Sequence, residues 1–132
     1  MTSRSEVFIK GAKNLLNSFK YAFWGIYKSF KSERNMKIHI AVATLVVIAG
    51  WILGLSITEW CICLGLFGLV MALELVNTAV EAVVDLVTQE RKPLAKIAKD
   101  TAAGAVLIAA IMAAIIGCII FVPKILVVLG MI

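Results

Sequence analysis

The chain has 132 residues, 62% of them hydrophobic, and its mean hydropathy of +1.02 lies above the range of soluble domains. These values exclude an ordinary soluble protein and predict one integral membrane domain over residues 1–132. The net charge of +5 comes from Lys and Arg residues, almost all of them before residue 38 or between residues 91 and 99. Such clusters suit an anionic membrane surface better than nucleic acid, so we expect no nucleic-acid partner.

The segment from about residue 6 to residue 34 is predicted to form an amphipathic helix. Its apolar and basic residues recur at helical spacing on opposite sides of the wheel: Phe8, Ala12, Leu15, Phe19, Phe23, Ile26 and Phe30 against Lys10, Lys13, Lys20, Lys28 and Lys31. This pattern indicates a helix lying on the membrane surface, although a helix packed on a partner protein has the same pattern.

Two arrangements are open for Glu33 at the end of this helix. If the helix continues, the carboxylate turns toward the apolar side, where it needs a cation nearby. If the chain breaks near Ser32, Glu33 pairs with Arg34 or Lys37 in solvent. The local sequence favours neither arrangement.

Three further segments, at about residues 36–57, 59–88 and 98–122, are predicted to be transmembrane helices. The first contains no charged residue between Lys37 and Glu59, and this uncharged stretch is long enough to span a bilayer. His39, at the basic end of the segment, is expected to be an interfacial side chain. The third is uncharged from Thr101 to Pro123 and carries small residues suited to close helix packing.

The connections and the end of the chain are predicted from charge and proline. A polar loop is expected from Thr88 to Lys99, with Pro93 as a helix breaker. The apolar tail at residues 123–132 is too short to span and is expected to lie in the outer interface. Basic residues crowd the N-terminal region and this loop, so the N-terminus is expected on the cytoplasmic side of the cell membrane.

The second transmembrane segment carries an acidic stripe. Its uncharged part, from Trp60 to Leu73, has only about 14 residues and is too short to cross alone. The crossing is completed by a segment in which four polar residues share an arc of about 80° on one helix face: Glu74, Asn77, Glu81 and Asp85. Carboxylates at membrane depth are costly and are functional candidates. Three short helices offer little interior to cover them, which favours a homo-oligomer.

The chemistry of this stripe has two readings. Glu33, Glu81 and Asp85 near one membrane face have the hard oxygen ligands that suit Mg²⁺, and Lys99 could contact a polyphosphate. Glu74 lies about 10 Å deeper along the axis, where it could take a proton from a lipid hydroxyl. A proton or cation pathway fits the stripe equally well, and no phosphate-binding glycine loop is present to decide.

Two motifs carry a resemblance to a known family. The segment Glu74–Asp85 reads ELVNTAVEAVVD, and residues 98–107 read AKDTAAGAVL. In this order and separation they strongly resemble the bacterial diacylglycerol kinase and undecaprenol kinase family, over about residues 21–121. The chain departs from many relatives at Arg91 and Lys92, where those carry an aromatic residue and a histidine.

The resemblance implies an all-α homotrimer, each chain with an N-terminal surface helix and three transmembrane helices. It implies MgATP-dependent phosphorylation of a lipid alcohol at the cytoplasmic face of the membrane. Carried over by position, Glu74 looks like the catalytic base and Asn77 like its neighbour, while Glu33 and Glu81 look like the Mg²⁺ carboxylates. The implied ATP contacts are these two carboxylates with Tyr21, Glu90, Lys99 and Asp100.

The segment from Ser32 to His39, SERNMKIH, is similar to the Gram-positive branch of the family, whose members phosphorylate undecaprenol. Undecaprenol is therefore the expected substrate, with diacylglycerol as the alternative.

Overall fold

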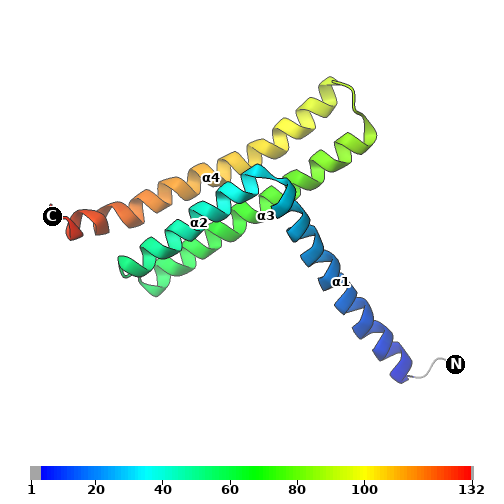
Figure 1. Ribbon diagram of the computed structural model, residues 1–132, viewed down its shortest axis with the longest axis horizontal. Coiled ribbons are helices and arrows are strands. Elements are labelled where there is room, and N and C mark those ends of the chain that lie inside the picture. The colour runs from blue at the N-terminus through cyan, green and yellow to red at the C-terminus, as the bar shows by residue number, and fades with distance from the viewer. Residues whose placement is uncertain (1–3, 132) are drawn as a thin grey trace. The chain divides into compact units, whose positions relative to one another are not determined.

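A computed structural model describes residues 4–131, with side-chain surroundings described for residues 10, 11 and 13–131. In this part of the chain the elements are four helices: α1 (Arg4–Ser32), α2 (Arg34–Ile52), α3 (Ile57–Val87) and α4 (Pro93–Val128) (Figure 1). The all-α class and the order of one amphipathic and three apolar helices are confirmed. The chain divides into two units, Met1–Glu33 and Arg34–Ile132, and each is described by itself.

The first unit is the amphipathic helix α1. Its apolar side chains from residue 15 onward are exposed, with Leu15 60%, Phe19 56% and Phe23 68% accessible. The predicted apolar positions Phe8 and Ala12 lie outside the residues whose side chains are described. The helix ends at Ser32 and the chain breaks at Glu33, as in the second arrangement for this residue, but the ion pairs of the described residues do not include the expected pair with Arg34 or Lys37. The Glu33 carboxylate accepts a 3.2 Å hydrogen bond from Ser32 Oγ.

The turn between α2 and α3 is built from local backbone chemistry. Gly54 has a φ of +63°, a left-handed conformation that glycine adopts without strain, and the Leu55 N–H closes the end of α2 by donating to the Gly50 carbonyl at 3.0 Å. Ser56 then caps α3. Its Oγ accepts the Glu59 N–H at 3.3 Å, and Glu59 Oε2 accepts the Ser56 N–H at 2.7 Å, which is a capping box.

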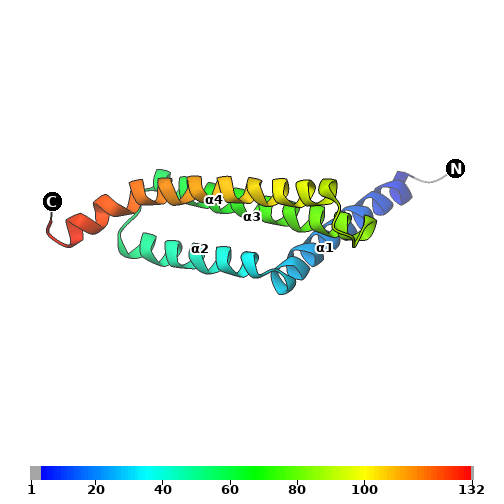
Figure 2. The same cartoon turned by 90° about the horizontal axis from the view of Figure 1, so that it is seen from above.

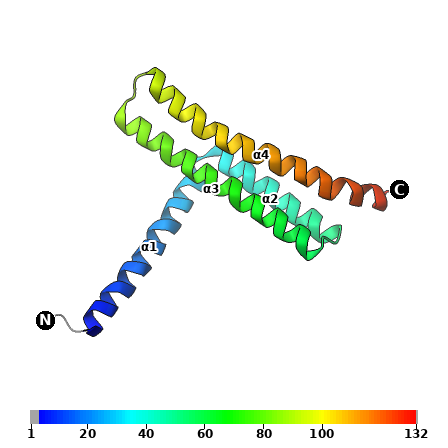
Figure 3. The ribbon, with the colours of Figure 1, turned by 180° about the vertical axis from the view of Figure 1, so that it is seen from behind.

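Helices α3 and α4 form an antiparallel hairpin, and the two run side by side over most of their length (Figures 1 and 3). Its loop is shorter than the expected Thr88–Lys99 segment, because Pro93 does not break a helix but begins α4. A proline is well placed there, since the first helical N–H has no intrahelical partner to lose.

Helix α4 also extends further than expected at its other end. The predicted stop at Pro123 was wrong, because the helix continues through this proline to Val128. Most of the expected apolar tail is therefore helical. Lys124 in this part lies 3.1 Å from Glu59 Oε2, and the ion pair holds the end of α4 against the start of α3.

Helix α2 packs against α3 and lies to one side of the α3–α4 pair (Figure 2). Helices α2, α3 and α4 are each long and apolar enough to cross a membrane. Most of their large apolar side chains are exposed, and the buried apolar residues are few: Met36, Leu55, Val70, Val106 and Ala109. A surface this apolar suits a lipid environment, which identifies a membrane protein.

Candidate active site

The acidic stripe of α3 runs from a buried end to an exposed end. Glu74 is 1% accessible and Asn77 6%, whereas Glu81 is half-buried and Asp85 is exposed. The solvent accessibility of the stripe thus increases toward the polar loop. Burying a carboxylate is costly, and a carboxylate kept at such a position is a functional candidate. Glu74 is therefore the strongest candidate for a reacting group.

Asn77 connects the two ends of this stripe. Its Nδ2 donates a 2.9 Å hydrogen bond to Glu81 Oε1, one turn along the helix. Since only the NH₂ end of the amide can donate to a carboxylate, this bond sets the orientation of the amide. Asn77 Oδ1 is buried and accepts no hydrogen bond from the described residues.

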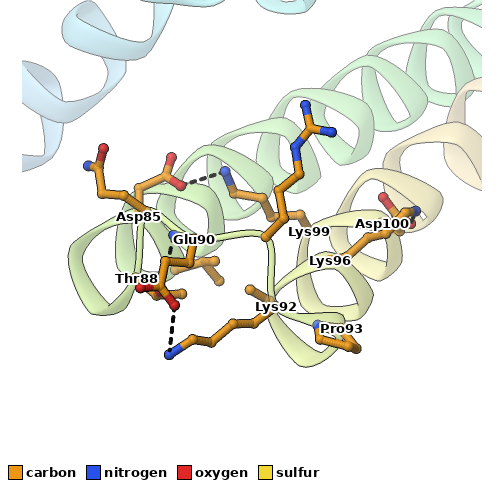
Figure 4. A pocket seen from close by; sticks show the side chains of 12 residues that line it. Asp85, Thr88, Glu90, Lys92, Pro93, Lys96, Lys99 and Asp100 are labelled. Atoms are coloured by element: carbon orange, nitrogen blue, oxygen red, sulfur yellow. Dashed lines mark hydrogen bonds and ion pairs between the residues drawn. The ribbon is translucent and has the colours of Figure 1, made fainter.

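A cavity of about 640 Å³ lies at the polar loop, between the end of α3 and the start of α4 (Figure 4). It brings together Glu90, Lys99 and Asp100, three of the residues expected to contact a nucleotide. Other charged and polar side chains also line it: Asp85, Thr88, Gln89, Arg91, Lys92 and Lys96. The excess of cations over carboxylates in this lining suits an anionic ligand.

The three lysines of the loop cavity each pair with a carboxylate. Lys99 Nζ lies 2.6 Å from Asp85 Oδ1 and joins α4 to α3, as the dashed line in Figure 4 shows. Lys96 pairs with Asp100 one turn further along α4, and Lys92 pairs with Glu90 at 3.5 Å. Asp85, expected beside Glu81 as a ligand of Mg²⁺, thus serves here as the partner of Lys99. These pairs are largely exposed, so each contributes little to stability and an anion can compete for the lysine.

A second cavity, of about 180 Å³, contains the buried end of the stripe. Glu74 and Asn77 line it from α3, and Asn35 and His39 line it from α2. The sequence-based expectation that His39 is an interfacial side chain missed this position, and Asn35 was not singled out at all. A signal was present: the two polar residues stand four apart, so they share one face of the helix.

The two cavities contain five of the eight predicted site residues, Glu81 lies between them on α3, and the other two belong to the first unit. Tyr21 on α1 is 70% accessible, and Glu33 is half-buried at the end of that helix. Their expected place beside the nucleotide remains a prediction. Within residues 4–131, no group of three or more His, Cys, Asp or Glu side chains gathers in a way that could hold a metal ion by itself. Mg²⁺ usually takes only one or two carboxylates besides phosphate oxygens, so Glu81 with a nucleotide still fits its donor chemistry.

Comparison with known proteins adds a family to this geometry. Residues 20–121 match the family described as prokaryotic diacylglycerol kinase. The chain is 48% identical over 119 residues to an undecaprenol kinase of Bacillus subtilis, covering 87% of this chain and 97% of that protein. It is 47% identical over 116 residues to a diacylglycerol kinase of Synechocystis, covering 87% and 66%. A diacylglycerol kinase of Escherichia coli K12 is 36% identical over 110 residues, covering 83% and 89%.

Proposed function

Because the chain belongs to the prokaryotic diacylglycerol kinase family and is a lipid kinase, we propose that it phosphorylates undecaprenol with ATP at the cytoplasmic face of the cell membrane. The observation that carries this proposal is the almost complete burial of Glu74 in a cavity between three helices that could span a membrane. A carboxylate in that position can meet a lipid hydroxyl that does not leave the bilayer.

In the transfer step Glu74 is the general base. The lipid hydroxyl gives its proton to the Glu74 carboxylate while its oxygen forms a bond to the γ-phosphorus of ATP. The bond from this phosphorus to the oxygen shared with the β-phosphorus breaks, and ADP leaves. The proton on Glu74 returns to water afterwards. Asn77 supports the step by holding the neighbouring carboxylate of Glu81.

The loop cavity is the proposed site for the nucleotide. Lys99 would contact a phosphate, exchanging its exposed partner Asp85 for a more highly charged anion. Glu90 and Asp100 line the same cavity, and Tyr21 and Glu33 of the first unit complete the proposed set of ATP contacts. The Arg91 and Lys92 side chains add positive charge beside it.

Mg²⁺ is the proposed metal, held by Glu81 and Glu33 together with ATP. When bound, such an ion neutralises the charge that develops on the β- and γ-phosphate oxygens. Glu81 suits this role because the Asn77 amide holds its half-buried carboxylate in one orientation.

The choice of lipid follows the relatives. The 48% identical relative is named an undecaprenol kinase, and the alignment covers nearly the full length of that relative. Other relatives are named diacylglycerol kinases. Undecaprenol is therefore the proposed substrate and diacylglycerol the alternative. The same relatives favour a kinase over the proton or cation pathway that the acidic stripe alone left open.

The proposed assembly is a homotrimer with its N-terminus in the cytoplasm. The large exposed apolar surface of α2, α3 and α4 leaves room for neighbouring subunits as well as lipid. The orientation rests on the basic residues before residue 38 and in the polar loop, which the positive-inside rule places on the cytoplasmic side.

The test is transfer of labelled phosphate from ATP to undecaprenol and to diacylglycerol, in the presence of Mg²⁺ and purified protein in lipid. Glu74→Gln is the blank, because the amide keeps the shape and loses the base, and a loss of at least about 100-fold in kcat is expected. Its thermal unfolding should match that of the wild type. Glu74→Gln protein that retains activity would remove Glu74 from this role, and wild type that labels neither lipid would overturn the kinase proposal for these substrates.

A further inference from the structure

The cavity beside Glu74 and Asn77 has a second polar wall that the proposed transfer step does not use. This wall is formed by Asn35 and His39, one turn apart on α2. His39 is half-buried, and it is the only histidine in the sequence.

The hydrogen-bonding groups on the α3 side of this cavity are acceptors. Glu74 carries a carboxylate, and the Nδ2 group of Asn77 is engaged by Glu81, which leaves Asn77 Oδ1 to face the buried side without a donor from the described residues. A lipid hydroxyl carries a single proton, which goes to Glu74, and its oxygen has lone pairs that need a donor. The α2 side can supply donors, since a neutral imidazole has one N–H and a carboxamide has two.

The shape of the cavity agrees with the hydroxyl end of a lipid. Opposite the polar groups, α4 contributes an apolar lining of Ala103, Val106, Leu107 and Ala110. The volume of about 180 Å³ corresponds to only a few water molecules at about 30 Å³ each. A space of this size is large enough for a hydroxymethyl group and the first carbons of a chain.

We propose that His39 positions the acceptor: its ring N–H donates to the oxygen of the lipid hydroxyl in this cavity, while Glu74 receives the hydroxyl proton. Asn35 adds a second group with N–H donors to the same wall of the cavity. The inference rests on the proposed lipid-kinase function and adds the residue that places the acceptor oxygen.

The first test separates lipid binding from nucleotide binding. His39→Ala should raise the KM for undecaprenol about tenfold, the effect of losing one hydrogen bond to a reacting group, with the KM for ATP unchanged. His39→Gln should recover most of the loss, because its side-chain amide keeps an N–H donor. Ile38→Ala is the matched control, since Ile38 is 50% accessible on the same helix and does not line the cavity.

The second test uses the wild-type protein and does not depend on a variant that folds. Diethylpyrocarbonate acylates the imidazole of the single histidine, and mass spectrometry measures the modified fraction. A polyprenol should slow this modification about tenfold at saturation, whereas a polyprene hydrocarbon of the same length without the hydroxyl should not.

Two results would overturn the role of His39. The first is a His39→Ala protein whose lipid KM stays within twofold of wild type, or rises together with the KM for ATP. The second is equal protection of His39 by the alcohol and the hydrocarbon. Wild type that labels neither lipid above the Glu74→Gln blank would instead refute the proposed function itself, so the two failures are distinguishable.

Discussion

The Asn77 amide donates a 2.9 Å hydrogen bond to Glu81, and through it the buried cavity of Glu74 is connected to the half-buried part of the same stripe. Both residues lie on α3, so the bond needs no other element to form. Its effect is to hold the Glu81 carboxylate in a fixed orientation relative to the buried carboxylate of Glu74. The proposed lipid and nucleotide ends of the reaction are thus joined by one rigid helix face.

Asn77→Ala should lower phosphate transfer about tenfold or more, because a hydrogen bond to a charged group is lost at the buried end of the stripe. The measurement is kcat for lipid phosphorylation together with the melting temperature. Thr78→Val is the control, since the Thr78 hydroxyl donates only within its own helix, to the Glu74 carbonyl at 3.0 Å. If Asn77→Ala and Thr78→Val were equally active, the link to Glu81 would have no part in catalysis.

Glu81→Gln should show a metal defect. The amide is a weaker ligand than a carboxylate, so the Mg²⁺ concentration for half-maximal activity should rise about tenfold or more at fixed ATP. The protein should remain folded, because Asn77 can still hydrogen-bond the amide oxygen. Titration of activity with Mg²⁺ measures the effect, and removal of Mg²⁺ with a chelator should abolish wild-type activity. A Glu81→Gln titration curve that overlays the wild type would exclude Glu81 from metal binding.

Lys99→Met should weaken ATP binding with little cost in stability. Its ion pair with Asp85 is partly exposed, so the loss in unfolding free energy should be below about 1 kcal/mol. A lost contact to phosphate should raise the KM for ATP about tenfold while the KM for the lipid stays constant. Lys13→Met on α1 is the control, because it removes the same charge from an exposed residue that does not line the loop cavity. An unchanged KM for ATP would refute the proposed phosphate contact.

Gly50→Ala should destabilise the α2–α3 turn. A Cβ at this position would lie 2.8 Å from the Trp60 ring and 3.3 Å from Leu55, so the indole must move. Overpacking of this kind costs about 1–3 kcal/mol. Gly11→Ala has open space around it and should leave the melting temperature unchanged or slightly raised. The half-life of activity at a raised temperature measures the stability of both variants. A Gly50→Ala protein with the half-life of the wild type would contradict the close packing of Trp60.

The membrane helices were predictable because length and hydropathy are local properties of the chain. The ends of these helices were less predictable. Pro93 was expected to break a helix and instead begins one, and Pro123 was expected to end the last helix and lies inside it. A proline in the first turn loses no hydrogen bond, and one in the interior of a membrane helix is tolerated where neighbouring groups and local backbone adjustment satisfy the freed carbonyl. Neither circumstance can be read from the neighbouring residues alone.

The candidate site was also predictable only in part. The α3 stripe was predictable, since Glu74, Asn77 and Glu81 stand at helical spacing and their shared face follows from geometry. The position of His39 was not, because a residue at the end of an apolar helix looks interfacial until the partner helix is known. The pairing of Lys99 with Asp85 likewise joins residues that are 14 positions apart.

By itself the sequence determined that this is an all-α membrane protein, which stretches are long and apolar enough to cross a bilayer and which face of the second of them is acidic, because hydropathy and helical period depend only on neighbours along the chain. The tertiary structure alone decided which residues share a cavity. It placed Asn35 and His39 opposite Glu74 and Asn77, and it gathered Glu90, Lys99 and Asp100 at the loop. The physical reason is that such contacts depend on how one helix is rotated and shifted against another, and packing of the whole bundle sets both.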